Sequence, residues 1–490
     1  MATKKGKSAK VSPAIEVTPE LARVLEAPRD LELRRAYAAS IAPDPLGEYV
    51  ATATEMLTAP TPRYFELALH AEELFRAHRN KWSSEWGREQ LFALGMYAGL
   101  PDLVHIEKSA SAEGLARLFG TCPIHELRLR NAKTDDVKTV VKVGGCARVR
   151  SLILRFDIAR AGKALKDCLF KAEWPKLESV RFGDSRWDDA AQLLAALPAL
   201  RRVSGAAIPR LEKLPQLGQL EHVGGPVFST KNRFLADEAT NLRSLGAAVF
   251  LNEEPLTMPS VRQLVLGNFT SGAVHCFPNL TELTLPYGPD KGQYSEADID
   301  DLASVPSWEN LESLAFGGAA ASLDMLAQRI LPRCRRLRHL QLQSAPCIPA
   351  ILEALPELET LSIDQQQGKY NPPFPLDDEQ LLRIAPYLRP KLRSLTLYGL
   401  FTLVGVEAVA QRATGLESVL FSANGFDAAC VERLLAMPAV RRIQLLNYHY
   451  QSVDALRGQP SRGRYLGPSP AMTGSQREPI WTHELVAPSV

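Results

Sequence analysis

The chain of 490 residues has little of several features that define common protein classes. Its seven cysteines are scattered and odd in number, and no C-x-x-C pair occurs, which argues against a disulfide framework. No apolar run reaches about 18 residues, so the sequence has no candidate transmembrane helix and we expect no membrane partner. The net charge is only +2, which gives no overall attraction to nucleic acid or to an anionic membrane. We therefore expect a cytoplasmic protein with reduced, mostly buried thiols.

Motifs for catalysis and for cofactor binding are missing as well. The sequence has no G-x-x-x-x-G-K-[ST], G-x-G-x-x-G, H-E-x-x-H or G-x-S-x-G. His70 and His78 lie eight residues apart, whereas two metal ligands on one helix need a spacing of about four. His275 and Cys276 have no further ligand or base nearby in the sequence. We therefore expect no enzyme, no catalytic residue, no cofactor and no metal site.

Both ends of the chain have the composition of disordered tails. Residues 1–12 carry four lysines, and no apolar segment follows them, which argues against a secretory signal. Residues 452–490 are rich in Gly, Pro and Ser, so we predict disorder there too. The alternative for the last twelve residues, PIWTHELVAPSV, is that they dock back as a C-terminal cap, since they are more apolar.

What the sequence does have is a repeated motif, L-x-x-L-x-L, present fourteen times from residue 124 onward. The first and fourth positions are apolar in every copy, and the sixth is clearly lost only at Gly205 and Gly225. One such unit cannot bury its own apolar side, whereas stacked units share a continuous core. Residues 121–451 are therefore predicted to form an α/β solenoid of about 14 repeats. Its curved parallel sheet would lie on the concave side and helices or irregular loops on the convex side, with irregular turns over 200–250.

The repeat resembles that of the leucine-rich repeat family. Nine of the thirteen intervals between copies lie in the range of 20–29 residues that is typical of that family. The family's usual Asn at the ninth position is missing here, except at Asn424, which leaves the subclass open.

A second regularity concerns charge at the second position of the repeat. From the second copy onward, the residues there are Arg150, Glu178, Arg201, Glu221, Arg243, Arg262, Thr281, Glu312, Arg338, Glu359, Arg393, Glu417 and Arg441. The signs mostly alternate, and neighbouring parallel strands lie about 4.8 Å apart. We therefore predict a ladder of ion pairs that fixes the register of the repeats; a partner-binding stripe is the alternative.

The region 13–120 lacks the repeat and has helical periodicity, so we predict a small all-α domain whose last helix covers REQLFALGMYAGL, residues 88–100. Part of it resembles the bacterial repeat-companion domain. The matching residues are Leu33, Arg34, Tyr37, Ala38, Ile41, Pro45, Gly47, Glu48, Tyr49, Val50, His78 and Trp82. The family's Asp-Trp after Tyr-Ala is replaced by Ala39 and Ser40. The resemblance implies a bacterial protein in which this module precedes leucine-rich repeats, and we expect it to cap the first repeat.

Candidate binding residues follow from the strand positions that face the concave side. They are Arg128, Arg130, Arg155, Arg181, Tyr287, His339, Gln341, Gln343, Asp364, Tyr398 and Gln444. The insertion 364–378 lengthens one repeat, and its Tyr370 and Phe374 are candidates for a contact loop. An ordinary surface loop is the alternative.

These features favour a non-enzymatic scaffold that binds a protein on the concave face, because Arg and Tyr are enriched at protein interfaces. The alternative is a nucleic-acid or anionic-ligand binder that uses the four arginines between 128 and 181. The low net charge and the lack of a basic stripe in later repeats disfavour nucleic acid. A purely structural helper is a third reading. The sequence does not identify the partner or the oligomeric state.

Overall fold

The computed structural model describes most of the chain between residues 17 and 486. The described ranges are 17–59, 61–86, 93–106, 112–130, 132–155, 163–183, 190–205, 211–229, 233–251, 256–269, 272–285, 294–317, 320–342, 348–363, 376–422, 428–440, 442–447, 464–471 and 480–486. The chain divides into two compact units. The first comprises Met1–Pro60 with Leu67–Leu200, and the second comprises Thr61–Glu66 with Arg201–Val490.

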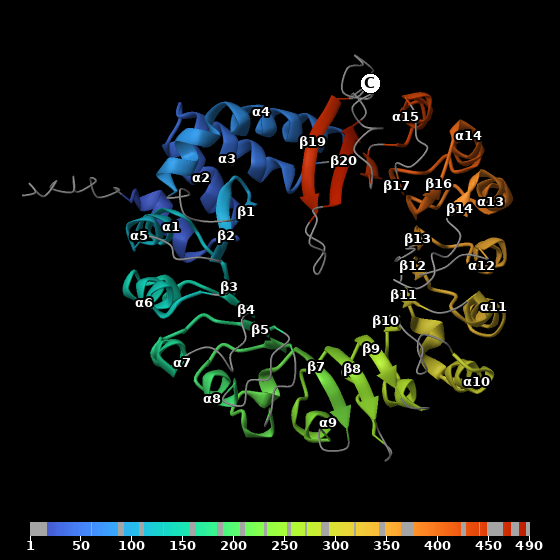
Figure 1. The fold of residues 1–490 in the computed structure, drawn as a ribbon, viewed down its shortest axis with the longest axis horizontal. Coiled ribbons are helices and arrows are strands. Elements are labelled where there is room, and N and C mark those ends of the chain that lie inside the picture. The colour runs from blue at the N-terminus through green and yellow to red at the C-terminus, as the bar shows by residue number, and fades with distance from the viewer. Residues whose placement is uncertain are drawn as a thin grey trace, which may run out of the picture. The chain divides into compact units, whose positions relative to one another are not determined.

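The first unit opens with helices, as the periodicity predicted. They are α1 (Pro19–Glu26), α2 (Leu31–Ser40), α3 (Pro45–Met56) and most of α4 (Thr61–Glu85) (Figure 1). The side chains of Thr18, Asp30 and Asp44 accept hydrogen bonds from the first exposed backbone N–H groups of α1, α2 and α3. Such N-caps satisfy donors that have no partner within the helix. The three short helices therefore have clear starting points in the sequence.

A β-hairpin follows where the sequence predicted a fifth helix. β1 (Ala93–Tyr97) pairs antiparallel with β2 (Leu100–Ile106), and β2 pairs parallel with β3 (Glu126–Arg130). The hairpin turns at Ala98 and Gly99, which both have positive φ, at 45° and 79°. The prediction of an all-α region up to residue 120 is therefore wrong for residues 93–106. Apolar residues at helical spacing were misleading there, because the turn and the pairing with β3 determine the local structure.

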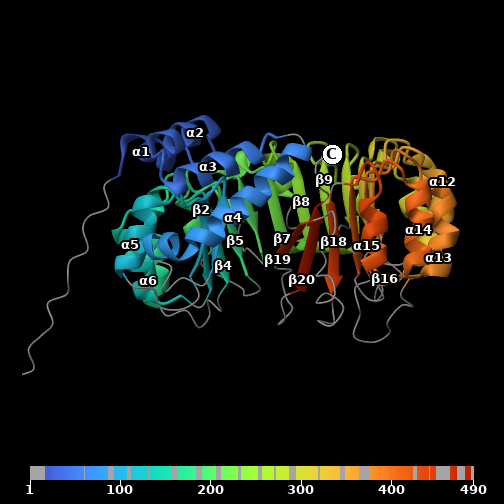
Figure 2. The same cartoon turned by 90° about the horizontal axis from the view of Figure 1, so that it is seen from above.

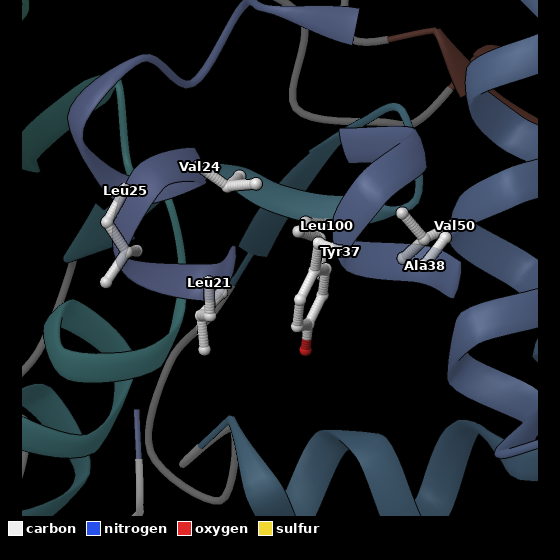
Figure 3. Close-up of a cluster of buried hydrophobic side chains, with 7 residues drawn as sticks. All are labelled: Leu21, Val24, Leu25, Tyr37, Ala38, Val50 and Leu100. Atoms are coloured by element: carbon white, nitrogen blue, oxygen red, sulfur yellow. The ribbon is translucent and has the colours of Figure 1, made fainter. Parts of the chain in front are cut away.

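The helices and the hairpin share one apolar core. Leu21, Val24, Leu25, Tyr37, Ala38, Val50 and Leu100 are all buried in it (Figure 3). These side chains come from α1, α2, α3 and the start of β2, so the helical segment packs directly on the hairpin. Gly99 is required at the turn, because a Cβ there would lie 2.7 Å from the Cα of Val50.

The repeats of the first unit continue the sheet in the order β1-β2-β3-β4-β5, with β4 (Ser151–Arg155) and β5 (Ser179–Phe182) parallel to β3. The return segments contain α5 (Ala112–Thr121), α6 (Thr134–Lys142), α7 (Lys163–Lys171) and α8 (Ala190–Ala195). Leu127, Leu152 and Val180 stand side by side in the register and are buried.

The second unit is a longer array of the same kind. Its parallel strands are β6 (Arg202–Ser204), β7 (His222–Ser229), β8 (Ser244–Leu251), β9 (Gln263–Phe269), β10 (Glu282–Leu285), β11 (Ser313–Phe316), β12 (His339–Leu342), β13 (Thr360–Ile363), β15 (Ser394–Leu397), β17 (Ser418–Ser422) and β18 (Arg442–Asn447). Its helices are α9 (Phe234–Glu238), α10 (Glu296–Ser304), α11 (Ala320–Arg329), α12 (Ile348–Ala354), α13 (Asp378–Ile384), α14 (Leu403–Arg412) and α15 (Ala428–Leu435). The strands form one layer and the helices the other (Figures 1 and 2). The predicted α/β class with a long, mostly parallel sheet is confirmed.

The repeated motif explains this layering. The residues at the first and fourth positions are buried in all fourteen copies. In LRSLTL, for example, Leu392 is 2% exposed and Leu395 is 0% exposed. The predicted shared core is thus confirmed at these positions.

The stretch 200–250 is more regular than predicted. β7 and β8 are eight residues long each and pair in register as far as Ser229 and Leu251. Gly225 leaves the sixth position empty, but Phe228 and Phe250 further along the strands are buried and stack at 4.7 Å. These rings replace the missing apolar contact, so the two strands are regular, whereas the predicted irregular turns concern the return segments. The return segments there do contain short 3-10 turns, at Leu211–Lys213 and Leu217–Gln219.

The predicted C-terminal tail 452–490 contains two strands, so the prediction of disorder is wrong for these segments. β20 (Ile480–Val486) pairs antiparallel with β18, and β19 (Arg464–Ala471) pairs antiparallel with β20. A terminal strand of a parallel array leaves a row of backbone groups without partners. The pairing of β20 with this edge agrees with the alternative that the last twelve residues dock back as a cap.

The predicted charge ladder is present in part, as separate ion pairs between two neighbouring repeats. Arg150 pairs with Glu178 at 2.5 Å in the first unit. In the second unit the pairs are Arg201–Glu221 at 3.0 Å, Arg338–Glu359 at 3.6 Å and Arg393–Glu417 at 3.3 Å. The backbone is joined at the same level: the carbonyl of Glu359, for example, accepts the N–H groups of both Arg393 and Ser394. The second position therefore links neighbouring repeats through side chain and backbone together.

Reversing one charge in this ladder should destabilise the fold slightly. In Glu359→Lys, the new cation would lie between Arg338 and Arg393, so we expect the free energy of unfolding to fall by about 0.5–1 kcal/mol, as is typical of exposed pairs. Glu353→Lys on α12 makes the same charge change on an exposed helix position outside the ladder and serves as the control. Chemical denaturation measures both. Unchanged stability of Glu359→Lys combined with loss of partner binding would instead support a partner-binding stripe.

The cysteines of the described ranges are free thiols, as predicted. Cys122, Cys146, Cys276, Cys334 and Cys430 are buried, and Cys168 is half-buried. Burial raises the pKa of the thiols of Cys122, Cys146 and Cys334 to about 12. These three side chains therefore act as small apolar core residues rather than as nucleophiles at neutral pH.

Candidate binding surface

The exposed face of the sheet in the first unit brings the four predicted arginines together. They lie on three neighbouring strands, and Arg130 is directly opposite Arg155 in the register of β3 and β4. Arg128 and Arg181 occupy one row on either side of Ile153. Arg130, Arg155 and Arg181 are exposed and Arg128 is half-buried. The strand alternation predicted this grouping correctly.

One carboxylate lies among these arginines. Glu126 accepts a hydrogen bond from Nε of Arg128 at 2.5 Å, and its other oxygen accepts one from the hydroxyl of Ser151 at 3.2 Å. This pair holds the Arg128 guanidinium over the sheet. In the described part of the chain, Arg155 and Arg181 have no ion-pair partner, so this face retains positive charge.

The exposed face of the second unit has a different character. Third and fifth positions alternate with the buried leucines, and their side chains are mostly small or polar. In the register the fifth positions run through Gly224, Gly246, Val265, Thr284, Ala315, Gln341, Ser362, Thr396, Leu420 and Gln444. Small side chains at many of these positions cover little of the strand backbone.

Polar side chains on this face bond across neighbouring strands. His339 lies 3.1 Å from the hydroxyl of Thr360, through its Nδ1. His222 repeats the arrangement with Ser244, at 2.9 Å. The predicted residues His339 and Gln341 are both exposed on β12, and Tyr398 is half-buried just after β15.

The sequence reasoning missed two residues of this face. His222 was not among the predicted residues. It is at the third position of its repeat, as the predicted residue His339 is. Val265 is 46% exposed on β9, an unusual exposure for an apolar strand residue. The sequence indicates this exposure, because Val265 is at the fifth position of VRQLVL, on the face opposite the buried fourth position.

Several predicted residues lie outside the described ranges. These are Tyr287, Gln343, Asp364, Tyr370 and Phe374. Gln444 lies on β18, but only its backbone is described. The contact-loop hypothesis for the insertion 364–378 therefore stays a prediction.

One cluster that the sequence could not reveal joins residues from different repeats. The hydroxyl of Ser304 lies 3.0 Å from Nε2 of His275, and the carboxylate of Asp301 lies 3.6 Å from the same nitrogen. A Ser-His-Asp relay needs the nucleophile and the acid on different ring nitrogens. In this arrangement both groups approach one nitrogen, and Asp301 also accepts the N–H of Gly272 at 2.6 Å, so the cluster fixes the turn before η6 (Ala273–Cys276). His275 is exposed at the surface.

Two further searches of the described residues bear on the class of protein. No three His, Cys, Asp or Glu side chains in these ranges come close enough together to hold a metal ion. Among the described helices, none has the length and apolar character needed to cross a membrane.

The fold and its exposed sheet define an α/β repeat protein with a long, mostly parallel sheet. No family model matches the chain. No curated protein matches it either. Among solved structures it is similar to a chain of the Toll–Spatzle complex from Drosophila, with 13% identity and a TM-score of 0.31. The match covers 74% of this chain and 53% of that chain, so this chain spans about half the length of its structural neighbour.

Proposed function

We propose that this chain is a leucine-rich repeat protein that acts as a non-enzymatic scaffold and binds a protein partner on the exposed face of its sheet. The leucine-rich assignment rests on the repeat period and on the burial of the first and fourth positions in all copies. We further propose that the helical segment before β1 is a repeat-companion-like cap. Its packing on the β1–β2 hairpin supports that role.

The observation that carries the binding proposal is the register of the second unit. Its strands from β6 to β18 pair so that third and fifth positions form continuous rows. With neighbouring strands about 4.8 Å apart, these eleven strands span about 50 Å along the sheet. That width matches a folded protein or a long peptide rather than a small molecule. Uncharged Ser, Thr and Gln side chains there have hydrogen-bonding groups without the desolvation cost of charges.

The test is to block this face without disturbing the core. Gln341→Arg places a long charged side chain at the fifth position of β12, whereas Gln328→Arg makes the same substitution at an exposed position of α11. We expect affinity capture with the wild type and Gln328→Arg to recover the same partner, and Gln341→Arg to lose it by tenfold or more, since about 1.4 kcal/mol is enough for tenfold. Equal recovery by all three proteins would contradict the proposal.

A further inference from the structure

Two arginines on the exposed sheet face of the first unit, Arg155 and Arg181, differ from the ladder arginines in how their charge is balanced. The ladder arginine Arg150 is paired with Glu178 at 2.5 Å. Arg155 and Arg181, on the exposed face of the same strands, have no such partner in the described part of the chain. The fold therefore neutralises the charge that fixes the register and leaves positive charge on the face that can bind.

The spacing of the cluster is that of a short extended peptide. Arg128 on β3 and Arg181 on β5 are separated by one strand, β4, so they lie two strand spacings apart, about 10 Å. Along β3, Arg128 and Arg130 are two residues apart, about 7 Å. Alternate side chains of an extended chain are also about 7 Å apart. Each guanidinium has a planar fork of donors that matches a carboxylate with two parallel hydrogen bonds.

We propose that Arg128, Arg130, Arg155 and Arg181 bind an acidic segment of a protein partner, with Asp or Glu at alternate positions of an extended chain. This inference rests on the proposed function and identifies the chemistry of one part of the partner. The Glu126–Arg128 ion pair positions one guanidinium for the incoming carboxylate. Ile153, at 7% exposure between Arg128 and Arg181, gives the centre of the site an apolar floor.

Nucleic acid fits the same face less well. A phosphate backbone needs a basic track that continues along the surface. On the other side of β3, the residues of β2 that face the same way are Leu103 and His105, which are both half-buried, so no arginine or lysine of β2 continues the basic group.

The experiment uses the full chain and two labelled probes of equal charge. One is a peptide with four glutamates at alternate positions, and the other is a single-stranded oligonucleotide with four phosphates. Fluorescence anisotropy at low salt measures both affinities. The double variant Arg155→Gln/Arg181→Gln removes the two unpaired cations. Arg336→Gln/Arg412→Gln makes the same charge change at exposed positions outside the sheet face and is the control.

We expect the peptide to bind the wild type and the control equally, and the face variant at least about tenfold more weakly. Peptide binding should also weaken as salt screens the charges. Tighter binding of the oligonucleotide, equal effects of the two double variants, or no binding of the peptide would each overturn the proposal. If the acidic-segment proposal fails but the proposed function holds, Gln341→Arg will still reduce partner capture. The two failures are therefore distinguishable.

Discussion

Replacing Arg34 by leucine should lower the free energy of unfolding by about 3–5 kcal/mol, because it leaves buried backbone carbonyls without a donor. Arg34 is fully buried, at 0% exposure. Its Nε donates to the carbonyl of Pro28 at 2.8 Å, and its Nη1 donates to the carbonyls of Tyr97 and Ala98 at 2.8 and 3.1 Å. One guanidinium thus joins the turn before α2 to the turn of the β1–β2 hairpin.

The charge of Arg34 is retained although the site is buried. Burial lowers its pKa to about 10, with the Asp102 carboxylate nearby acting in the opposite direction, so the side chain is protonated at neutral pH. Asp102 itself pairs with Arg29 at 2.8 Å. Lysine at position 34 could not span three carbonyls with a planar fork, so Arg34→Lys should lose an intermediate amount of stability.

Arg35 provides the control for this prediction. It is the next residue on α2, and its side chain is 43% exposed and pairs with Glu32 on the surface. Arg35→Leu should change the free energy of unfolding by no more than about 0.5 kcal/mol. Denaturant unfolding followed by circular dichroism measures both variants. If Arg34→Leu unfolded at the wild-type midpoint, the hydrogen bonds of Arg34 would not hold the helical segment on the hairpin.

The second large effect is expected at Gly415, where two turns of neighbouring repeats come into close contact. A Cβ at this position would lie 1.7 Å from the carbonyl oxygen of Pro390. Both partners are backbone in the turns before β15 and β17, so neither can rotate away as a side chain would. We expect Gly415→Ala to cost about 3 kcal/mol or more, because overpacking here must separate the repeats.

Gly225→Ala is the matched control, since it makes the same substitution in the same unit. No atom lies within 4 Å of a Cβ built at Gly225. Its stability should therefore stay within about 0.5 kcal/mol of the wild type. Equal midpoints for the two variants in thermal or denaturant unfolding would show that the contact between Gly415 and Pro390 relaxes without cost.

The sequence predicted the features that repeat. The burial of Leu392 and Leu395 and the pairing of Arg393 with Glu417 follow from one motif copied many times, because each copy must pack against the next. The alternation within a strand likewise placed Arg155 and Gln341 on the exposed face.

Features that depend on distant backbone contacts could not be predicted in this way. Residues 93–106 form a hairpin because β2 extends the sheet at β3, and helical spacing of apolar residues contains no information about that neighbour. The role of Gly415 depends on a carbonyl 25 residues earlier in the chain, at Pro390. The Ser304–His275–Asp301 cluster depends in the same way on the stacking of two repeats.

Site-specific photo-crosslinking tests most directly the claim that the exposed sheet face binds the partner. A photoreactive residue is placed at Gln341 or Thr396 on the face, and at Gln328 or Gln411 on the helices of the second unit. We predict adducts with the same partner from the two strand positions and none from the two helix positions. Adducts from Gln328 or Gln411 without any from Gln341 or Thr396 would contradict the account, because the partner would then bind the helical side.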